Sequence, residues 1–190
     1  ITKNVVCLEN CTNWAPIGSP AETIDLLPGA FARFNVTVTN NSAFTKIPRI
    51  VIDDHLTKDW MCPGSVRAIL AGTVVTPDFA GFTPDGVRRT YNFPSRPAAP
   101  WIAPGETLTL SFDIQVPPSY STSGISPDAT NNITVEGFTE ACDKPDGQPC
   151  ITVRDTASVD VRQPRMECHK SVSADVGDDF LLENGVLSKE

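Results

Sequence analysis

The chain is short of the residues that most enzymes and nucleic-acid-binding proteins rely on. It has two histidines and two methionines among 190 residues, and 15 Lys and Arg against 23 Asp and Glu give a net charge of −8. A surface of that sign repels a phosphate backbone or an anionic membrane. No apolar run approaches the roughly 20 residues that span a bilayer. The composition argues against a nucleic-acid partner and against direct membrane insertion, and it favours a scaffold over an enzyme.

The six cysteines are even in number and lack the C-x-x-C spacing of zinc and redox sites. Disulfides formed in an oxidising compartment are the simplest account. A short loop with Pro145, Gly147 and Pro149 predicts a Cys142–Cys150 disulfide. The other four cysteines are Cys7, Cys11, Cys62 and Cys168, and they allow three pairings. Among these we select Cys7–Cys11. Nothing resembles a signal peptide, and the chain opens at Ile1. We expect a mature secreted product or a piece of a longer protein, located extracellularly or at the cell surface.

Alternation of apolar and polar residues with period two is the clearest structural signal. Over residues 107–116, every second residue is apolar: Leu108, Leu110, Phe112, Ile114 and Val116. Over 32–39, Phe34, Val36 and Val38 alternate in the same way and stop at the turn-forming Asn40-Asn41-Ser42. Further strands are expected over 1–7, 49–54, 68–75, 132–138 and 157–161.

Proline and glycine separate these runs, and no stretch has the apolar stripe of a helix. We therefore predict an all-β protein, an immunoglobulin-like two-sheet antiparallel sandwich of about seven strands. The least periodic region, Met61 to Pro100, is interpreted as a decorated central insert. We assign residues 1–162 to the sandwich.

The last residues, 163–190, are too few to close a second sandwich. Cys168-His169-Lys170-Ser171-Val172 echoes Ile1-Thr2-Lys3-Asn4-Val5, so this segment is interpreted as a linker and the start of a following repeat, or as a strand given to a neighbouring subunit. The assembly strand would include Met166, Cys168, Lys170 and Val172, with a second strand over 180–187 and Cys168 as a candidate for an intermolecular disulfide. The alternative is a flexible tail of a truncated chain.

Several segments taken in order resemble a known family. They are Leu27-Pro28-Gly29, then 34–40 (FNVTVTN), 50–56 (IVIDDHL), 103–106 (APGE), 131–135 (NNITV) and 157–161 (ASVDV). The order is similar to that in the conserved-repeat immunoglobulin-like domain, a domain of unknown function found in tandem in large prokaryotic cell-surface proteins. Residues 168–173 are similar to the opening of a following copy. The resemblance implies a sandwich with an extracellular architectural role, and it brings no catalytic residues. The six cysteines and the long insert depart from the family pattern.

Candidate catalytic and metal-binding residues are few. Asp53 and His55 share one face of a predicted strand and Asp54 takes the other, but no third ligand can be identified, so a strand-ending Asp that caps the next turn is the preferred interpretation. Asp143-Lys144-Pro145-Asp146-Gly147 lacks the alternating oxygen ligands of an EF-hand. Neither histidine lies near a nucleophile signature. We predict no enzyme activity, no metal and no cofactor.

Lys3 suggests a covalent alternative, an intramolecular isopeptide bond to Asn131 or Asn132. Such a bond needs a buried lysine, an asparagine in contact with it and a neighbouring carboxylic acid that moves the proton. The sequence identifies the lysine and the asparagine but not the acid. A lysine at a strand edge that discourages aggregation is the competing interpretation.

Four N-x-S/T triplets predict glycosylation sites at Asn10, Asn35, Asn40 and Asn132. For the whole chain we predict a non-catalytic structural repeat or subunit of a surface filament, sheath or stalk, assembled head to tail by strand donation. Its partners would be copies of itself or adjacent repeats. The alternative is an adhesin that binds glycans or proteins through insert aromatics, namely Trp60, Phe79, Phe82, Tyr91 and Trp101. A metal-dependent hydrolase around Asp53 and His55 is the third possibility.

Overall fold

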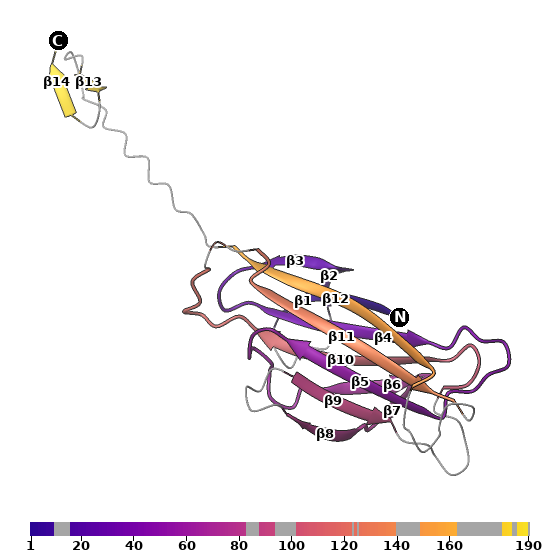
Figure 1. The fold of residues 1–190 in the computed structure, drawn as a ribbon. Helices are drawn as coiled ribbons and strands as arrows, with labels where there is room; N and C mark the ends of the chain where they lie inside the picture. The colour runs from indigo at the N-terminus through magenta and orange to yellow at the C-terminus, as the bar shows by residue number, and fades with distance from the viewer. Residues whose placement is uncertain are drawn as a thin grey trace.

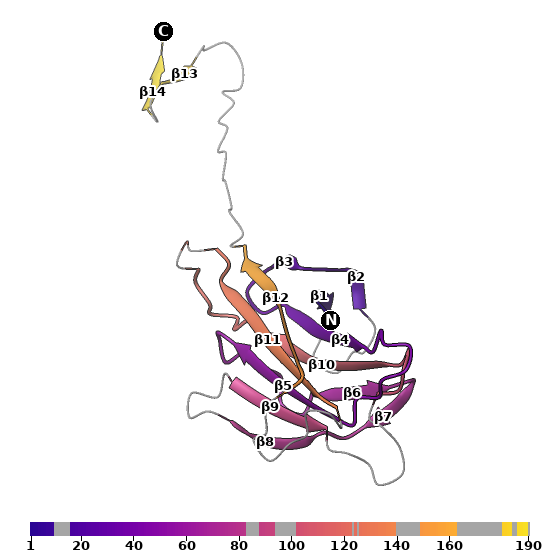
Figure 2. The same ribbon diagram turned by 45° about the vertical axis from the view of Figure 1, so that its right-hand side comes forward.

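The fold is a sandwich of two six-stranded sheets (Figures 1 and 2). The computed structural model describes residues 1–9, 16–82, 88–93, 102–122, 124, 126–139, 149–162, 180–183 and 186–189. The first sheet has the order β2-β1-β4-β10-β6-β7. Its strands are β1 (Thr2–Leu8), β2 (Pro16–Ala21), β4 (Phe31–Thr39), β6 (Arg67–Leu70), β7 (Thr73–Val75) and β10 (Thr107–Gln115).

The second sheet packs face to face with the first and has the order β3-β12-β11-β5-β9-β8. Its strands are β3 (Thr23–Leu26), β5 (Arg49–Leu56), β8 (Asp78–Phe82), β9 (Arg88–Phe93), β11 (Ala129–Phe138) and β12 (Ile151–Val161). All neighbours pair antiparallel except β3, which runs parallel to β12 at one edge. The described residues contain no helix that is long and apolar enough to cross a membrane.

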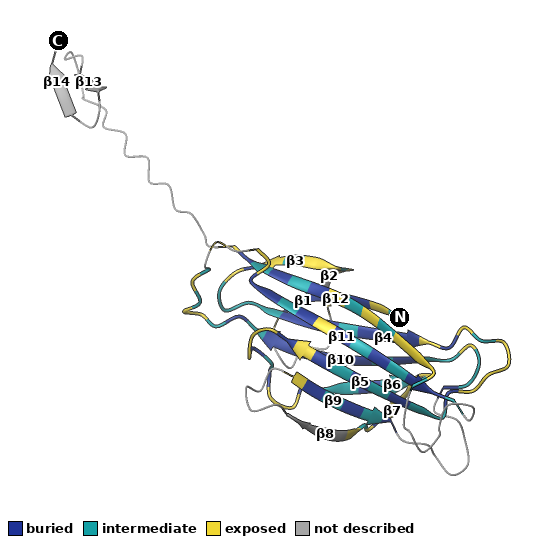
Figure 3. Ribbon diagram, viewed as in Figure 1, coloured by how far each residue is buried: buried dark blue, intermediate teal, exposed yellow. Residues whose placement is uncertain are grey.

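The two-sheet sandwich and the strands expected from alternation are confirmed. The apolar sides of β4 and β10 are buried, as are Asn131, Ile133 and Val135 on β11 (Figure 3). The strand count of about seven was too low. The short strands β2, β3 and β8 lack a clear alternation or a long apolar run, β9 lies inside the predicted insert, and 68–75 is a hairpin whose turn places Ala71 and Gly72 at positive φ. The described part of the predicted insert therefore contributes four strands to the two sheets, β6 to β9.

The outer face of β10 is also covered, which its sequence did not predict. Asp113 lies on the polar side of this strand, opposite the apolar residues, but it is buried under the connection from β5 to β6. There Cys62 donates its backbone N–H to the Asp113 carbonyl, and Met61 bridges to Ile114. Arg33 on the neighbouring strand β4 pairs with Asp113 beneath this cover, at 2.7 Å from Nε to Oδ1 and 3.1 Å from Nη2 to Oδ2.

At the C-terminal end, β13 (Phe180–Glu183) and β14 (Val186–Lys189) pair with each other as an antiparallel hairpin. Met166, Cys168, Lys170 and Val172 lie outside the described residues, so the predicted assembly strand and the boundary at residue 162 stay predictions.

Candidate functional site

A layer of polar residues crosses the apolar core of the sandwich. One apolar cluster contains Ile52 and Ile133, and the other contains Leu56 and Ala129. Along β5, Asp54 lies between Ile52 and Leu56, and along β11, Asn131 lies between Ala129 and Ile133. Lys3 reaches the same level from β1 of the opposite sheet. These three residues, the polar layer, are at most 3% exposed. Since most buried residues here are apolar, three polar side chains meeting in the core require an explanation.

The atoms of the polar layer are close and incompletely hydrogen-bonded. Lys3 Nζ lies 3.6 Å from Asp54 Oδ2, and Asn131 Nδ2 donates to Asp54 Oδ1 at 2.8 Å. Lys3 Nζ, Asp54 Oδ2 and Asn131 Oδ1 have no hydrogen-bond partner. Lys3 Nζ also lies 5.6 Å from the centre of the Phe34 ring, on the apolar side of the site. Asp54 thus faces the lysine nitrogen with one oxygen and the asparagine nitrogen with the other.

Burial shifts both titratable groups of the layer toward their neutral forms. It lowers the pKa of Lys3 below its ordinary value, against the opposing attraction of Asp54 and Asp155. It raises the pKa of Asp54, against the attraction of Lys3, the hydrogen bond from Asn131 and the charge of Arg89. The neutral form of the lysine is a nucleophile and the protonated form of the aspartic acid is a proton donor. The polar layer therefore brings together an amine, an amide and an acid that can pass a proton between them.

This arrangement bears on three residues whose roles the sequence left open. Asp54 is a buried carboxyl group beside Lys3, and it is not a turn-capping residue, because it lies within β5 and points into the core. Asn131 lies on the inner face of β11 and reaches Asp54, the carboxylate that also pairs with Lys3, whereas Asn132 is exposed on the other face. The Lys3 side chain is buried in the core, so it does not present a charge at an exposed sheet edge. The edge-lysine interpretation was therefore wrong.

The other candidates do not assemble into a site. Asp53 and His55 share one face of β5, as expected; that face points away from the core, and Arg88 pairs with Asp53. Among the described residues no group of three or more His, Cys, Asp and Glu gathers as a set of metal ligands. The 143–147 loop lies outside the described residues.

The cysteines and the glycosylation triplets have mixed outcomes. Cys7 is a free cysteine, so the predicted Cys7–Cys11 pair is not formed. Cys62 and Cys150 are each disulfide-bonded, while Cys11, Cys142 and Cys168 lie outside the described residues, so Cys142–Cys150 stays a prediction.

Among the predicted glycosylation sites, Asn40 is buried, and its Nδ2 donates to the carbonyls of Thr45 and Ile102, which leaves no room for a glycan in the folded domain. Asn35 is half-buried and its Nδ2 donates to Asn4, whereas Asn132 is exposed. Asn10 lies outside the described residues.

The insert aromatics distinguish an adhesin from an architectural module. Trp60 is buried with its ring edge-on to Tyr120, and Tyr91 is buried in the core. The side chains of Phe79, Phe82 and Trp101 are not described. Aromatic residues that bind a ligand would be expected at the surface, so the two described ones support an architectural role.

Comparison with known proteins gives a likeness of fold. No protein-family model matches the chain, and no curated protein does. The major pilin subunit BcpA of Bacillus cereus matches with a TM-score of 0.54 and 11% identity, over 83% of this chain and 39% of that one. The full-length major pilin SpaD of Corynebacterium diphtheriae gives a TM-score of 0.49 and 11% identity, over 82% of this chain and 33% of that one. The collagen-binding subdomain of the Enterococcus faecalis surface protein ACE gives a TM-score of 0.45 and 13% identity, over 73% of this chain and 93% of that one.

The chain thus spans well under half the length of the pilins that it matches. At these identities the likeness concerns the arrangement of strands. It agrees with the sandwich built above from alternation and burial.

Proposed function

We propose that the chain is a non-catalytic structural module of an extracellular surface filament, sheath or stalk, and that an amide bond between Lys3 and Asn131 ties its two sheets together. The polar layer is the observation that carries this proposal, because its three buried groups have no other evident use. The sandwich fold shared with a major pilin subunit supports it. The adhesin alternative is supported less, because Trp60 and Tyr91 are buried.

The chemistry is a single condensation that balances without a cofactor. Lys3 Nζ attacks Asn131 Cγ to form the new carbon–nitrogen bond, and the bond from Cγ to Nδ2 breaks. Asp54 accepts a proton from the amine through Oδ2 and delivers its own proton from Oδ1 to the departing nitrogen. Ammonia leaves, and Asp54 ends as it began. The reaction alters the chain itself once, so the module is not an enzyme acting on a separate substrate.

The position of this bond suits a domain that carries tension. A pull on the N-terminal end enters the sandwich at β1, and a pull on the other end leaves it after β12. A bond from Lys3 to Asn131 joins β1 to β11, and β11 pairs with β12 along their length. Tension then passes through a covalent bond and one long ladder of hydrogen bonds, and it bypasses the strands between β1 and β11.

The first test is the intact mass of the purified chain. We expect it to be about 17 Da below the mass of the sequence, apart from the small change from disulfides, because one ammonia is lost. Lys3→Met, Asp54→Ala and Asn131→Ala should each keep the full mass. Asn132→Ala is the matched control and should still lose ammonia. A fragment that links β1 to β11 after trypsin would locate the bond, and an unmodified mass in the wild-type chain would refute the cross-link.

Assembly by strand donation is a separate part of the proposal. The tail residues Met166, Cys168, Lys170 and Val172 are proposed to pair with a sheet of the next subunit or repeat. Main-chain hydrogen bonds can recreate a missing strand between molecules, and such a head-to-tail contact does not close on itself. In the sequence echo, Lys170 corresponds to Lys3, so the donated strand would carry an equivalent lysine.

Electron microscopy of the full chain and of a chain that ends at Pro164 tests this assembly. We expect filaments or short oligomers from the full chain and monomers from the truncated one. Identical assembly by both chains would show that the tail is not the donated strand. The intact mass of the truncated chain should still show the loss of ammonia, so the two parts of the proposal can fail separately.

A further inference from the structure

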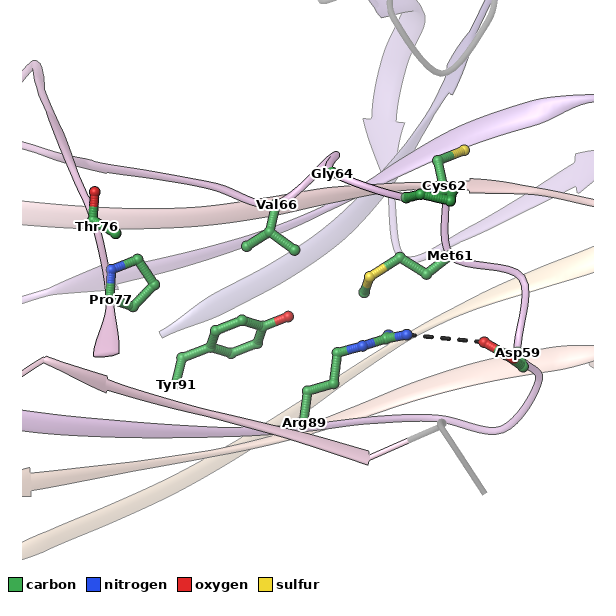
Figure 4. Close-up of a pocket in the computed structure, with 10 residues that line it drawn as sticks. Asp59, Met61, Cys62, Gly64, Val66, Thr76, Pro77, Arg89 and Tyr91 are labelled. Atoms are coloured by element: carbon green, nitrogen blue, oxygen red, sulfur yellow. Dashed lines mark ion pairs between the residues drawn. The ribbon is translucent and has the colours of Figure 1, made fainter. Parts of the chain in front are cut away.

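A pocket of about 640 Å³ lies next to the polar layer at the side of the sandwich. Apolar side chains line it, including Met61, Val66 and Pro77, and Arg89 and Tyr91 come from β9. Figure 4 shows Arg89 extending toward Asp59, with Tyr91 beside it and Met61 across from them. The pocket gives the guanidinium of Arg89 a route to solvent on one side of an otherwise buried site.

Arg89 also borders the polar layer. In the pairing of β5 with β9, Arg89 lies directly opposite Asp54, and both are buried. The Arg89 side chain is 6% exposed, and its Nη2 lies 3.9 Å from Oδ1 of Asp59, whose side chain is 69% exposed. A guanidinium keeps its charge at every pH at which a protein is folded. Asp54 therefore has a permanent cation as its cross-strand neighbour.

The groups that face Asp54 come from both sheets. Lys3 approaches from β1, Asn131 from β11, and Arg89 and Tyr91 from β9. Asp155 on β12 accepts a hydrogen bond from the backbone N–H of Lys3, and Phe34 of β4 packs near the lysine nitrogen. Burial raises the pKa of the Tyr91 phenol, so this group stays neutral. Arg89 is thus the one cation among these groups that does not take part in the bond.

We propose that Arg89 is a positioning residue for the cross-link, and that its fixed charge sets the highest pH at which the amide bond forms. This proposal rests on the cross-link of the preceding subsection. The bond requires Asp54 in its protonated form, since the carboxyl must give a proton to the departing nitrogen. A neighbouring cation favours the carboxylate, so Arg89 makes Asp54 lose its proton at a lower pH than burial alone would allow. The reaction would then slow as the pH rises past that point.

The experiment follows the loss of ammonia in time. The full chain is recovered unfolded from inclusion bodies, where the polar layer has not assembled, and is refolded by dilution over a series of pH values. Intact mass gives the rate of bond formation, and far-UV circular dichroism confirms that folding is faster than the bond. We call the pH above which this rate falls the alkaline limit. It should move upward by about one pH unit in Arg89→Met. At a pH above the wild-type limit, each unit of movement corresponds to a rate about tenfold higher.

Matched variants separate this effect from a loss of packing. Arg89→Lys keeps the charge and should keep the wild-type limit. Arg88→Met removes one positive charge from the same strand on the outer face, where Arg88 pairs with Asp53, and it should also leave the limit unchanged. Asp59→Asn strengthens the field of Arg89 and should move the limit downward, which provides a test even if Arg89→Met does not fold.

The outcomes distinguish the two proposals. If Arg89→Met folds and keeps the wild-type limit, or if Arg88→Met moves the limit as far, Arg89 does not have this role, although the cross-link stands. If Arg89→Met does not fold and Asp59→Asn leaves the limit in place, the role is again refuted. If the wild-type chain never loses ammonia at any pH, the cross-link itself is wrong.

Discussion

An Asn131→Ala variant is expected to melt about 10–20 °C below the unsubstituted chain. A covalent link that closes a loop on the order of 100 residues stabilises a fold by about 5 kcal/mol in the loop-closure model, because it restricts the unfolded chain. A change of 1 kcal/mol shifts the melting temperature of a domain of this size by about 2–4 °C. Differential scanning calorimetry measures the difference directly. The exposed neighbour variant, Asn132→Ala, should melt within the error of the wild-type chain.

A double variant separates the bond from local packing. Lys3→Met removes the amine but keeps most of the apolar stem, so it should lower the melting temperature by a similar amount. The combination of Lys3→Met with Asn131→Ala should cost little more than either single change, since a bond that is already absent cannot be lost twice. Fully additive effects would mean that the two residues contribute independently and that no bond joins them.

Arg33→Ala is expected to destabilise the domain by about 3–5 kcal/mol. The change leaves the Asp113 carboxylate buried beneath the β5–β6 connection without the guanidinium that now contacts both of its oxygens. An uncompensated buried charge is far more costly than a missing surface contact. Urea unfolding followed by tryptophan fluorescence measures the loss as a lower midpoint.

Arg162→Ala is the control for this prediction. Arg162 pairs with Asp25 at 3.0 Å, but both side chains are more than half exposed, so we expect a loss of stability far smaller than that of Arg33→Ala. Replacing both members of the buried pair, as in Arg33→Met with Asp113→Leu, should be milder than Arg33→Ala alone. Equal effects of Arg33→Ala and Arg162→Ala would show that the burial of the first pair adds nothing to its stabilising effect.

The sequence predicts the faces of the strands but not the way the two sheets meet. Alternation along 107–116 and 32–39 identifies the inner faces of β10 and β4, because a strand with one buried face reveals it locally. The same rule separates Asp54 from Asp53 and His55. It cannot show that Lys3 of the opposite sheet lies at the level of Asp54, since that depends on how the two sheets stack. The acid of the site was therefore missed, although its strand was predicted.

Arg89 and Asp113 were missed for related reasons. Arg89 lies on β9, a short strand inside the predicted insert, and its inward direction is set by pairing with β5. Asp113 lies at a polar position of a well-predicted strand, and only the connection folded over it buries the side chain. A side chain that is buried only by a distant part of the chain leaves no sign of this burial in the residue pattern of its own strand. An alternation such as that of Arg89, Tyr91 and Phe93 is the signal that could have marked β9.

The place of the proposed cross-link in the chain also bears on digestion by proteases. With the Lys3–Asn131 amide formed, every residue between these two positions belongs to a closed covalent ring, including the surface connection from β5 to β6 over residues 57–66. One cut anywhere in that ring opens it but releases no fragment, because both pieces stay joined through the side chains. A nicked molecule would keep its two sheets together, so a protein exposed to extracellular proteases would remain one connected molecule after its first cleavage.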